Sequence, residues 1–332
     1  MVAMVKDASV SVAQTGRRVT ALAGGVGGAK LAQGLARVVS GDTLAIIVNT
    51  ADDFELYGLS ISPDIDTVMY TLAGLANPVQ GWGVVGDTRA TLDAIARYGE
   101  DPWFLLGDQD FATHIVRTAR LRQGLPLSTV TAQLAAALRI SARLLPMTDD
   151  RIATYVHTPA GTLGFQDYFV ARRQQDDVTG VTFEGVETAT PAPGVIEALT
   201  DVDIIVVGPS NPIVSIGPIL AVPGIRDALA SSTAVRIGVS PIVGGKALKG
   251  PADRMLATLG HDVSALGVAR IYAGLLDILV IDEQDASIGP EIERLGIEVV
   301  VANTIMGGPE DRERFAREML TAATLHRRSV HQ

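Results

Sequence analysis

Residues 20–30, TALAGGVGGAK, constrain the fold of this chain more than any other stretch. An apolar segment of strand length leads into a glycine-rich turn, and the turn leads into the helical pattern of residues 31–39. A second apolar segment of strand length follows at residues 44–49. This order predicts a βαβ unit with parallel strands, in which the glycine turn lies at the carboxyl end of the first strand.

The glycine turn has the composition of an anion site. Glycine backbone can approach a bound anion closely, and a helix start offers N–H groups and a partial positive charge. The turn lacks the G-x-G-x-x-G spacing of a dinucleotide fold and the GK[ST] ending of a Walker loop, so a tight turn without a ligand stays an alternative. The nucleotide-binding residues predicted here are Gly24, Gly25, Val26, Gly27, Gly28 and the cation Lys30.

The composition narrows the class of protein. Apolar residues make up 47% of the 332 residues, which is ample for the core of one large or two smaller α/β domains. The net charge of −10 argues against a nucleic-acid-binding surface. The absence of cysteine excludes disulfides, thiolate metal sites and cysteine nucleophiles. No apolar run approaches the ~20 residues that span a bilayer, and the first residues lack a signal-peptide pattern, so we expect a cytoplasmic protein without a membrane segment.

Strand and helix patterns alternate along the rest of the chain. Helical spacing occurs at residues 65–75, 88–98, 110–122, 128–140 (with Ser128 as a candidate N-cap) and 309–323. A two-residue period at residues 151–183 predicts a small antiparallel meander. Apolar strands are predicted at residues 203–207, 235–239 and 278–281, with an edge strand at 298–302.

These patterns together predict an α/β protein with a Rossmann-like, doubly wound, mostly parallel sheet. We expect a single domain over residues 19–325, with an inserted, mostly helical region at about 76–185 and a small antiparallel β appendage. A flexible extension at residues 1–18 and a frayed tail at residues 326–332 complete the expected organisation. In such sheets ligands bind outside the carboxyl ends of the strands, so the segments that follow each strand carry the candidate site.

The segment after the second strand is rich in carboxylates. Within NTADDFELYGLSISPDIDTVMY, four aspartates lie close together in the sequence: Asp52, Asp53, Asp64 and Asp66. Hard oxygen ligands of this kind suit Mg²⁺ or Ca²⁺, and Mg²⁺ commonly bridges one or two carboxylates to substrate phosphates. Helix capping explains one acid near the start of the helix at residues 65–75, but not four.

Three further segments offer polar groups. GDQDFATHIVR, residues 107–117, combines Asp108, Asp110, His114 and Arg117, and Asp110 and His114 are one helical turn apart. GPSNPIVSIGPI places Ser210 and Asn211 at the end of a buried strand, and SPIVGGKALKGPADRM begins with Ser240 and carries Lys246, Lys249 and Arg254. The alternative for His114 is a purely structural role. The alternative for the last two segments is a surface loop that binds no ligand.

Taken in order, these motifs resemble the 2-phospho-L-lactate transferase family. The resemblance rests on AGGVGGAK, VNTADDF, SPDIDTVMYTL, GDQDFATHIVR, LLPMTDDR, GFQDYFV, GPSNPIVSIGPI and SPIVGGKALKGPADRM, and it extends from about residue 19 to residue 323. It implies transfer of a phospholactyl or phosphoenolpyruvyl group from a guanosine diphosphate-linked donor to 7,8-didemethyl-8-hydroxy-5-deazariboflavin (FO), with release of GMP, in the biosynthesis of coenzyme F-420. It also implies a Rossmann-like body, a requirement for Mg²⁺ and a homodimer.

The resemblance also implies roles for individual residues. The glycine turn would hold the donor diphosphate, and Ser210, Asn211 and the segment from Ser240 would hold guanine, ribose or phosphate. Asp53 and Asp64 are the expected Mg²⁺ ligands, with Asp52 in reserve. The expected acceptor side consists of Asp66, Asp108, His114 and Arg117, with Asp66 contacting the ribityl chain or orienting its terminal hydroxyl.

Two other functions stay open on the sequence. Many relatives carry Gly-Gly-Thr-Gly in the first turn, whereas this chain has Gly25-Val26-Gly27-Gly28, and a related bacterial branch binds a nucleotide sugar and regulates growth. The expected acceptor side favours the transferase branch. A nicotinamide-dependent dehydrogenase would fit the βαβ start but lacks the dinucleotide fingerprint. The sequence does not distinguish lactate, enolpyruvate and glycerate as the three-carbon acid of the donor, nor does it identify a general base.

Overall fold

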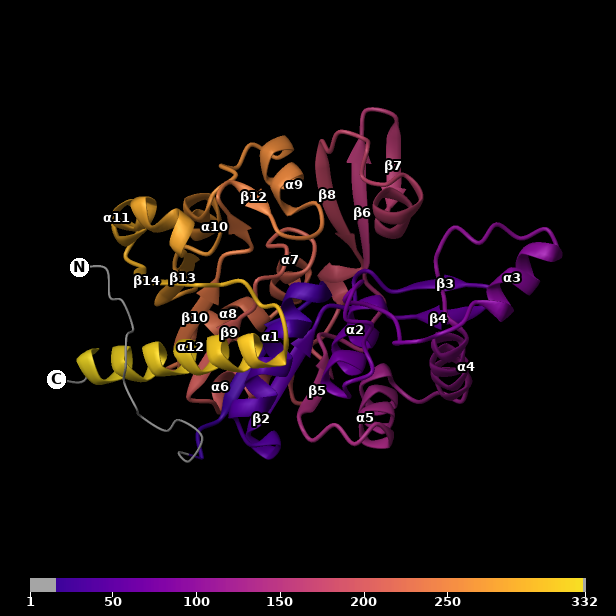
Figure 1. Cartoon of the computed structure of the whole chain (residues 1–332), viewed down its shortest axis with the longest axis horizontal. Helices are drawn as coiled ribbons and strands as arrows, with labels where there is room; N and C mark the ends of the chain where they lie inside the picture. Colours follow the sequence, from indigo (N-terminus) through magenta and orange to yellow (C-terminus); the bar gives the residue numbers. More distant parts are fainter. Residues whose placement is uncertain (1–15, 331–332) are drawn as a thin grey trace.

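A seven-stranded parallel sheet runs through the centre of the molecule, as the computed structural model in Figure 1 shows for the described residues, 16–330. Its strand order is β14-β13-β10-β9-β1-β2-β5, and every neighbouring pair is parallel. The strands are β1 (Val19–Ala23), β2 (Leu44–Val48), β5 (Arg143–Pro146), β9 (Ile204–Val207), β10 (Val235–Val239), β13 (Ile278–Asp282) and β14 (Glu298–Ala302). The predicted doubly wound α/β fold is confirmed, and Glu298–Ala302 is an edge strand as expected.

Helices cover both faces of this sheet. Along β1, Leu22 packs into the core on one face while Ala21 and Ala23 pack into the core on the other, which explains why the strands are continuously apolar. One face is covered by α1 (Gly25–Val38), α2 (Pro63–Leu72), α5 (Leu127–Ala137) and α12 (Pro309–Val330). The other face is covered by α6 (Val195–Thr200), α7 (Ile216–Ala221), α8 (Ile225–Ser231), α10 (Ala265–Ile271) and α11 (Gly289–Glu293).

The chain reverses its direction of travel across the sheet between β1 and β9. From β1 it proceeds outward through β2 to β5, and it then returns to β9 and proceeds the other way through β10, β13 and β14. Leu22 of β1 and Val207 of β9 are register partners, although the two strands are far apart in the sequence. Their loops therefore diverge at the carboxyl edge and leave a crevice, which is where open α/β sheets bind ligands.

Two extensions flank this crevice. The first is an arm between β2 and β5 that carries the hairpin β3 (Phe54–Leu56) and β4 (Leu59–Ile61) and the helices α3 (Ala90–Arg97) and α4 (Asp108–Arg122); it projects to the right in Figure 1. The second is a small antiparallel sheet of β6 (Ala153–Thr158), β7 (Gly161–Gly164) and β8 (Gly180–Glu184), in the order β7-β6-β8. The structure thus divides the insertion expected at 76–185, because β5 returns to the central sheet within it.

Several local predictions differ from the structure. The hairpin β3–β4 and the central strand β5 were not predicted, and the predicted meander is interrupted by a π-helical turn, η3 (Asp167–Ala171). Ser128 is not the N-cap of α5, because Pro126 takes that position and both the Ser128 amide and hydroxyl donate to the Asp149 carboxylate. The remaining short elements are η2 (Gly41–Thr43), η4 (Val186–Thr188), β11 (Ile242–Val243), β12 (Lys246–Ala247), α9 (Ala252–Thr258) and η5 (Glu283–Ile288).

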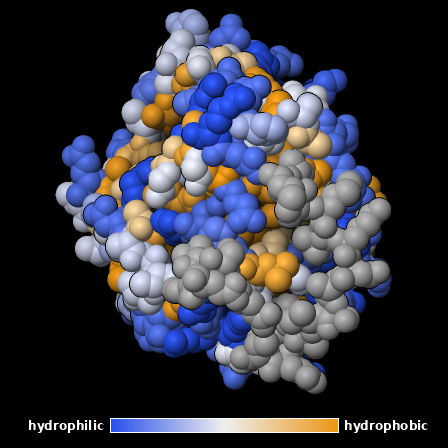
Figure 2. Space-filling view, turned by 90° about the vertical axis from the view of Figure 1, so that its left-hand side faces the viewer, coloured by the Kyte–Doolittle hydropathy of each residue, from blue (hydrophilic) through white to orange (hydrophobic). Residues whose placement is uncertain are grey.

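The two ends of the described chain lie against the body. Helix α12 continues to Val330, so the chain is helical where a frayed tail was expected from residue 326. Contacts hold it there: the His326 ring lies 2.5 Å from a Glu298 carboxylate oxygen, and Arg327 donates to Asp203 over 2.8 Å. Most of the predicted flexible extension at 1–18, namely residues 1–15, lies outside the described residues. Figure 2 shows hydrophilic side chains interrupted by apolar patches on the face nearest these ends.

No helix within residues 16–330 is both long enough and apolar enough to cross a bilayer.

Candidate active site

A cavity of about 560 Å³ opens where β1 and β9 end. The glycine turn, the loop after β2, the start of α2 and the loop after β9 form one half of its wall, and these segments contribute polar groups. The arm and the segment around η3 form the other half with aromatic and aliphatic side chains. A cavity with one polar and one apolar half suits a substrate pair in which an anionic group meets a ring system.

The glycine turn is the first turn of α1 rather than a loop before it. Helix α1 begins at Gly25, and Gly24, in an extended conformation, is its N-cap without a side-chain cap. Only glycine fits at position 27 without a steric clash, because a Cβ there would lie 2.5 Å from the carbonyl oxygen of Pro209. Gly24, Gly25, Val26 and Gly27 line the cavity as predicted, whereas Gly28 packs behind the turn against Ser210.

Asn49 brings two buried aspartates together beside this turn. Its Nδ2 donates to Asp52 Oδ2 over 3.1 Å and to Asp64 Oδ2 over 3.0 Å, and Asp64 Oδ1 accepts from the Gly25 amide over 2.7 Å. Asp52 Oδ1 is buried without a partner. Burial raises the pKa of both carboxyls, and the Asp64 charge raises the pKa of Asp52 further. A bound cation would reduce the repulsion between these two carboxylates.

Asp53, which the sequence favoured over Asp52 as a metal ligand, does not line the cavity. Its Oδ2 accepts a hydrogen bond from Ser62 Oγ over 2.6 Å, and burial raises the pKa of its carboxyl. The reserve candidate, Asp52, takes the cavity position beside Asp64. Between residues 16 and 330 no three or more acidic, histidine or cysteine side chains form a metal site by themselves. A divalent cation here would therefore share its coordination with oxygens of a ligand, as Mg²⁺ commonly does.

Arg117 holds Asp66 from behind. Its side chain is 0% exposed; Nη1 donates to Asp66 Oδ2 over 3.0 Å, and Nη2 donates to Asp66 Oδ1. Asp66 lines the cavity, whereas Arg117, predicted on the acceptor side, lies behind Asp66 and outside the lining. A bidentate Arg–carboxylate pair fixes both the position and the plane of the carboxylate.

The same arginine sets the tautomer of His114, which also lines the cavity. Arg117 Nη1 lies 3.1 Å from His114 Nδ1, and a guanidinium can only donate, so Nδ1 accepts and the ring proton resides on Nε2. Burial lowers the pKa of His114 to about 4, with Asp66 opposing and Arg117 assisting this shift. His114 is therefore neutral at physiological pH, and its Nε2–H has no partner within the described chain.

The acid predicted at position 108 lies outside the cavity. Asp108 is the first residue of α4, and its carboxylate accepts from the amides of Thr91 and Ala90 at the start of α3. Asp110 lines the cavity in its place, and burial raises the pKa of its carboxyl to about 6. The one-turn spacing of Asp110 and His114 in the sequence was the signal for this site.

The later strand exits contribute unequally. Ser210 and Asn211 line the cavity as predicted; Ser210 Oγ accepts from the Gly24 amide over 3.1 Å and donates to the Gly24 carbonyl over 2.8 Å. Ser240 is buried away from the cavity and bonds to the backbone of Ile242. Lys30 is also turned away, because its ammonium donates to the Met306 carbonyl over 2.8 Å.

Among the described residues, the basic side chain that lines the cavity comes from a segment distant in sequence from the glycine turn. Lys249 lines the cavity, and its ammonium donates to the carbonyl oxygen of Gln80 over 2.9 Å. The sequence placed Lys249 in a cationic segment but did not single it out.

Aromatic rings form the apolar half. Phe165 and Phe169 stack with centroids 5.4 Å apart and an interplanar angle of 8°, and both line the cavity. Trp82 and Phe104 come from the arm. No specific signal in the sequence predicted this wall, because Trp82 and Phe104 lie far along the chain from Phe165 and Phe169, and the two pairs meet only through the packing of the two extensions.

A family model described as 2-phospho-L-lactate transferase CofD matches residues 19–305, and this range contains every residue of the cavity. The chain belongs to this family of transferases.

Relatives in this family match over nearly their whole length. A protein of Streptomyces griseus named phosphoenolpyruvate transferase is 45% identical over 312 residues, covering 92% of this chain and 98% of that protein. A protein of Methanosarcina mazei named 2-phospho-L-lactate transferase is 39% identical over 299 residues, covering 90% and 98%. A solved structure of a UPF0052-family protein from Bacillus halodurans superposes with a TM-score of 0.61 over 92% of this chain and 99% of that chain. At 16% identity it shows the fold alone.

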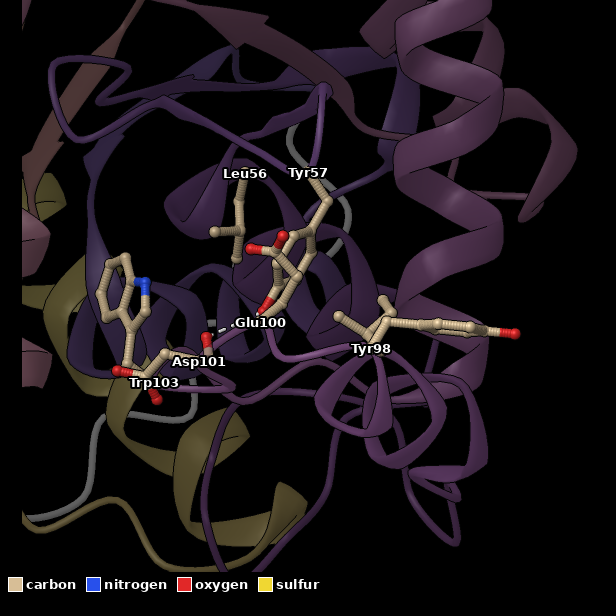
Figure 3. Close-up of a pocket in the computed structure, with 7 residues that line it drawn as sticks. Leu56, Tyr57, Tyr98, Glu100, Asp101 and Trp103 are labelled. Atoms are coloured by element: carbon tan, nitrogen blue, oxygen red, sulfur yellow. Dashed lines mark hydrogen bonds between the residues drawn. The ribbon is translucent and has the colours of Figure 1, made fainter.

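A second hollow, of about 590 Å³, lies on the arm of this CofD-family protein and shares no residue with the cavity. Figure 3 shows Tyr57, Glu100 and Asp101 between Trp103 on one side and Tyr98 on the other, and a hydrogen bond of 3.0 Å joins the Tyr57 hydroxyl to the Asp101 carbonyl. Neither the glycine turn nor any of Asp52, Asp64 and His114 lines it, so the candidate site is the cavity at the carboxyl ends of β1 and β9.

Proposed function

We propose that this CofD-family protein moves a phosphoenolpyruvyl group from a guanosine diphosphate-linked donor to the ribityl hydroxyl of FO, releasing GMP. Phosphoenolpyruvyl is chosen over phospholactyl because the relatives named phosphoenolpyruvate transferase have the higher identities, 43–45% against 39–40%. The observation that carries the proposal is the joining, in one cavity, of a helix N-terminus and carboxylate pair with an aromatic wall.

The polar half suits the donor. The amides of Gly24 and Gly25 are already bonded to Ser210 and Asp64, which leaves the amides of Val26 and Gly27 in the uncapped first turn of α1. These two N–H groups and the positive end of the helix dipole would hold the diphosphate. Asn211 of the β9 loop lines the adjoining wall, where the guanosine would lie.

Asp52 and Asp64 would hold Mg²⁺. The fit rests on the unpartnered Asp52 Oδ1 and on the mutual repulsion of the two buried carboxylates. When bound, Mg²⁺ neutralises charge on the diphosphate and on the leaving phosphate. Asn49 keeps the two carboxylates in position for this by donating to both.

The apolar half suits the acceptor. The deazaflavin ring would lie against Phe165 and Phe169, which places the ribityl chain toward Asp66 at the boundary between the two halves. Asp66, held in one orientation by Arg117, would accept a hydrogen bond from the terminal hydroxyl and aim its oxygen at the donor. The hydroxyl oxygen forms a bond to the phosphorus that carries the enolpyruvyl group, the bond from that phosphorus to the GMP phosphate breaks, and the hydroxyl proton is released.

The test is a reaction with purified components. Incubation with FO, the guanylyl-linked phosphoenolpyruvate donor and Mg²⁺ is expected to yield GMP and a more acidic deazaflavin, and a chelator should stop the reaction. Mass spectrometry separates the enolpyruvyl product from the lactyl product, which is heavier by two hydrogen atoms. Binding of a nucleotide sugar with no transfer to FO from either donor would contradict the proposal.

A further inference from the structure

The cavity of this protein has an unusual charge balance for a site that takes an anion. Four aspartates line it: Asp52, Asp64, Asp66 and Asp110. Among the residues described, Lys249 is the only lysine or arginine in the same wall. A diphosphate entering this cavity therefore meets one protein cation, and that cation lies on the side of the glycine turn.

Lys249 is free to meet an anion. Its ammonium bonds to the Gln80 carbonyl, and no carboxylate within residues 16–330 pairs with it. It lies in an exposed segment, between a glycine at position 250 with φ +74° and the short hairpin β11–β12. An ammonium has three N–H donors, so a bond to one carbonyl leaves two for phosphate oxygens.

The bond to Gln80 ties Lys249 to a loop of the arm. Residues 77–86, NPVQGWGVVG, cross over the glycine turn, and three glycines of this loop adopt positive φ, at positions 81, 83 and 86. A Cβ on Gly81 would lie 2.6 Å from Val26 Cγ1 and 3.4 Å from Lys249 Nζ, so the loop rests directly on the turn and on the lysine. The same loop carries Trp82, which lines the cavity and is 38% exposed.

We propose that Lys249 binds a phosphate oxygen of the donor while keeping its bond to Gln80, so that an occupied phosphate site holds loop 77–86 and Trp82 down over the cavity. The donor half and the acceptor half are then coupled, since the loop that the phosphate locks supplies a ring to the acceptor wall. This inference rests on the proposed use of the cavity for a diphosphate, but it requires neither guanine nor FO.

The experiment uses Trp82 as a reporter. The chain has two tryptophans, and Trp103 packs on the arm against Phe54 and Phe104, outside the cavity, so Trp103→Phe leaves Trp82 as the sole indole. Binding of GDP with Mg²⁺, and separately of inorganic pyrophosphate with Mg²⁺, is followed by calorimetry and by acrylamide quenching of Trp82. Both anions are expected to bind and to protect Trp82 from the quencher.

Lys249→Met in this background should weaken binding of both anions about tenfold, the loss of one charge-assisted hydrogen bond, and should abolish the protection of Trp82. Lys246→Met is the matched control, because it removes the same charge from the same segment at an exposed side chain outside the cavity. Wild-type affinity of Lys249→Met, or binding that leaves the quenching of Trp82 unchanged, overturns the inference, as does failure of both anions to bind. If protection depends on Lys249 but no group is transferred to FO, the inference stands and the proposed function fails.

Discussion

At the scale of single residues, Asn49 and Arg117 decide how the acids of this cavity are presented. Asn49 donates to Asp52 and Asp64 through one nitrogen, so two like charges lie closer together than they would in water. Arg117 occupies both oxygens of Asp66 and so prevents that carboxylate from turning. Within the described residues the two acids beside Asn49 have no cationic partner, whereas Asp66 is paired with Arg117.

Asp52→Asn and Asp64→Asn should therefore differ in stability. An asparagine at 52 can keep the bond from Asn49 through its oxygen and place its NH₂ at the unpartnered position, which also removes the repulsion between the two carboxylates. We expect this variant to gain stability in the presence of a chelator, on the order of 1 kcal/mol, the free energy of one pKa unit. Urea unfolding measures it.

An asparagine at position 64 cannot keep both of the hydrogen bonds that the Asp64 carboxylate accepts. Both Asp64 oxygens accept from fixed donors, the Gly25 amide and Asn49 Nδ2, so one donor must face the new NH₂ group. This variant should lose about 1–3 kcal/mol, and both variants should lose transferase activity. Full activity of Asp52→Asn would show that Asp52 holds no metal.

Arg117→Met should destabilise the protein by about 3–5 kcal/mol, because it leaves the buried carboxylate of Asp66 without its counter-charge. Arg117→Met combined with Asp66→Asn should regain most of that loss without regaining activity. Urea unfolding of the two single variants and the double variant measures the coupling. Additive losses would mean that the pair is not a unit.

Two titrating groups on α4 should oppose each other between pH 6.5 and 4. The pKa of His114 is lowered from 6.5 to about 4, so its contribution to stability is complete above pH 6.5 and is lost as the pH falls through that window. The pKa of Asp110 is raised from 3.8 to about 6, so the folded state gains stability over nearly the same fall in pH.

His114→Gln removes the contribution of His114 to the pH dependence of stability. The stability of wild type relative to His114→Gln should therefore decrease by up to about 3 kcal/mol as the pH falls from 7 to 4, measured by urea unfolding at each pH. Asp110→Asn removes the stabilisation that protonation of Asp110 provides at low pH. This variant should therefore lose stability more steeply than wild type as the pH falls. A pH-independent difference between wild type and His114→Gln would show that His114 is not held neutral.

At the scale of elements, the glycine turn joins β1, α1 and the loop after β9. Gly27 approaches the carbonyl of Pro209, and Gly24 and Ser210 exchange two hydrogen bonds. The turn thus fixes where the two central strand exits lie relative to each other, in addition to offering N–H groups to a ligand.

Gly27→Ala and Gly25→Ala separate these two roles. The alanine at 27 meets a backbone carbonyl 2.5 Å away and should push the β9 loop outward, with loss of both stability and GDP binding. The alanine at 25 has open space but a φ of +59°, so we expect a loss of only about 1 kcal/mol. Thermal unfolding and GDP titration of both variants measure this. Equal losses would contradict the steric argument.

The sequence predicted the elements whose signal is local. Continuous apolar runs identified the central strands except β5, which no strand pattern in the sequence predicted, and the glycine turn identified the transition from β1 to α1. The sequence did not predict which of several neighbouring acids line the cavity. Whether Asp52 or Asp53 faces it depends on where Asn49 and Ser62 lie, and Asp108 bonds instead to the amides at the start of α3. Spacing along the chain does not carry that information.

At the scale of the whole molecule, the cavity lies where the carboxyl edge of the parallel sheet meets the two extensions. The sheet edge supplies the helix N-terminus and the carboxylate pair, and the arm and the η3 segment supply rings. The polar half, which we propose binds the donor, lies at the sheet edge where α/β proteins commonly bind ligands. The aromatic half, which we propose binds the acceptor, comes from the two extensions and not from the sheet. Changes to the part of the wall outside loop 77–86 should therefore affect mainly the acceptor.

Phe169→Ala tests this division. Phe169 stacks on Phe165 and is partly exposed in the cavity, and a stacking ring contributes about 0.5–1.5 kcal/mol beyond the area that it buries. We expect KM for FO to rise roughly tenfold with little change in GDP affinity, since Phe169 belongs to the stacked aromatic pair and not to the glycine turn or the carboxylate pair. Phe169→Leu, which keeps the apolar volume without the ring, should lie between wild type and the alanine variant. A parallel loss of GDP affinity would mean that the two halves are not separate sites and that the aromatic wall supports the nucleotide.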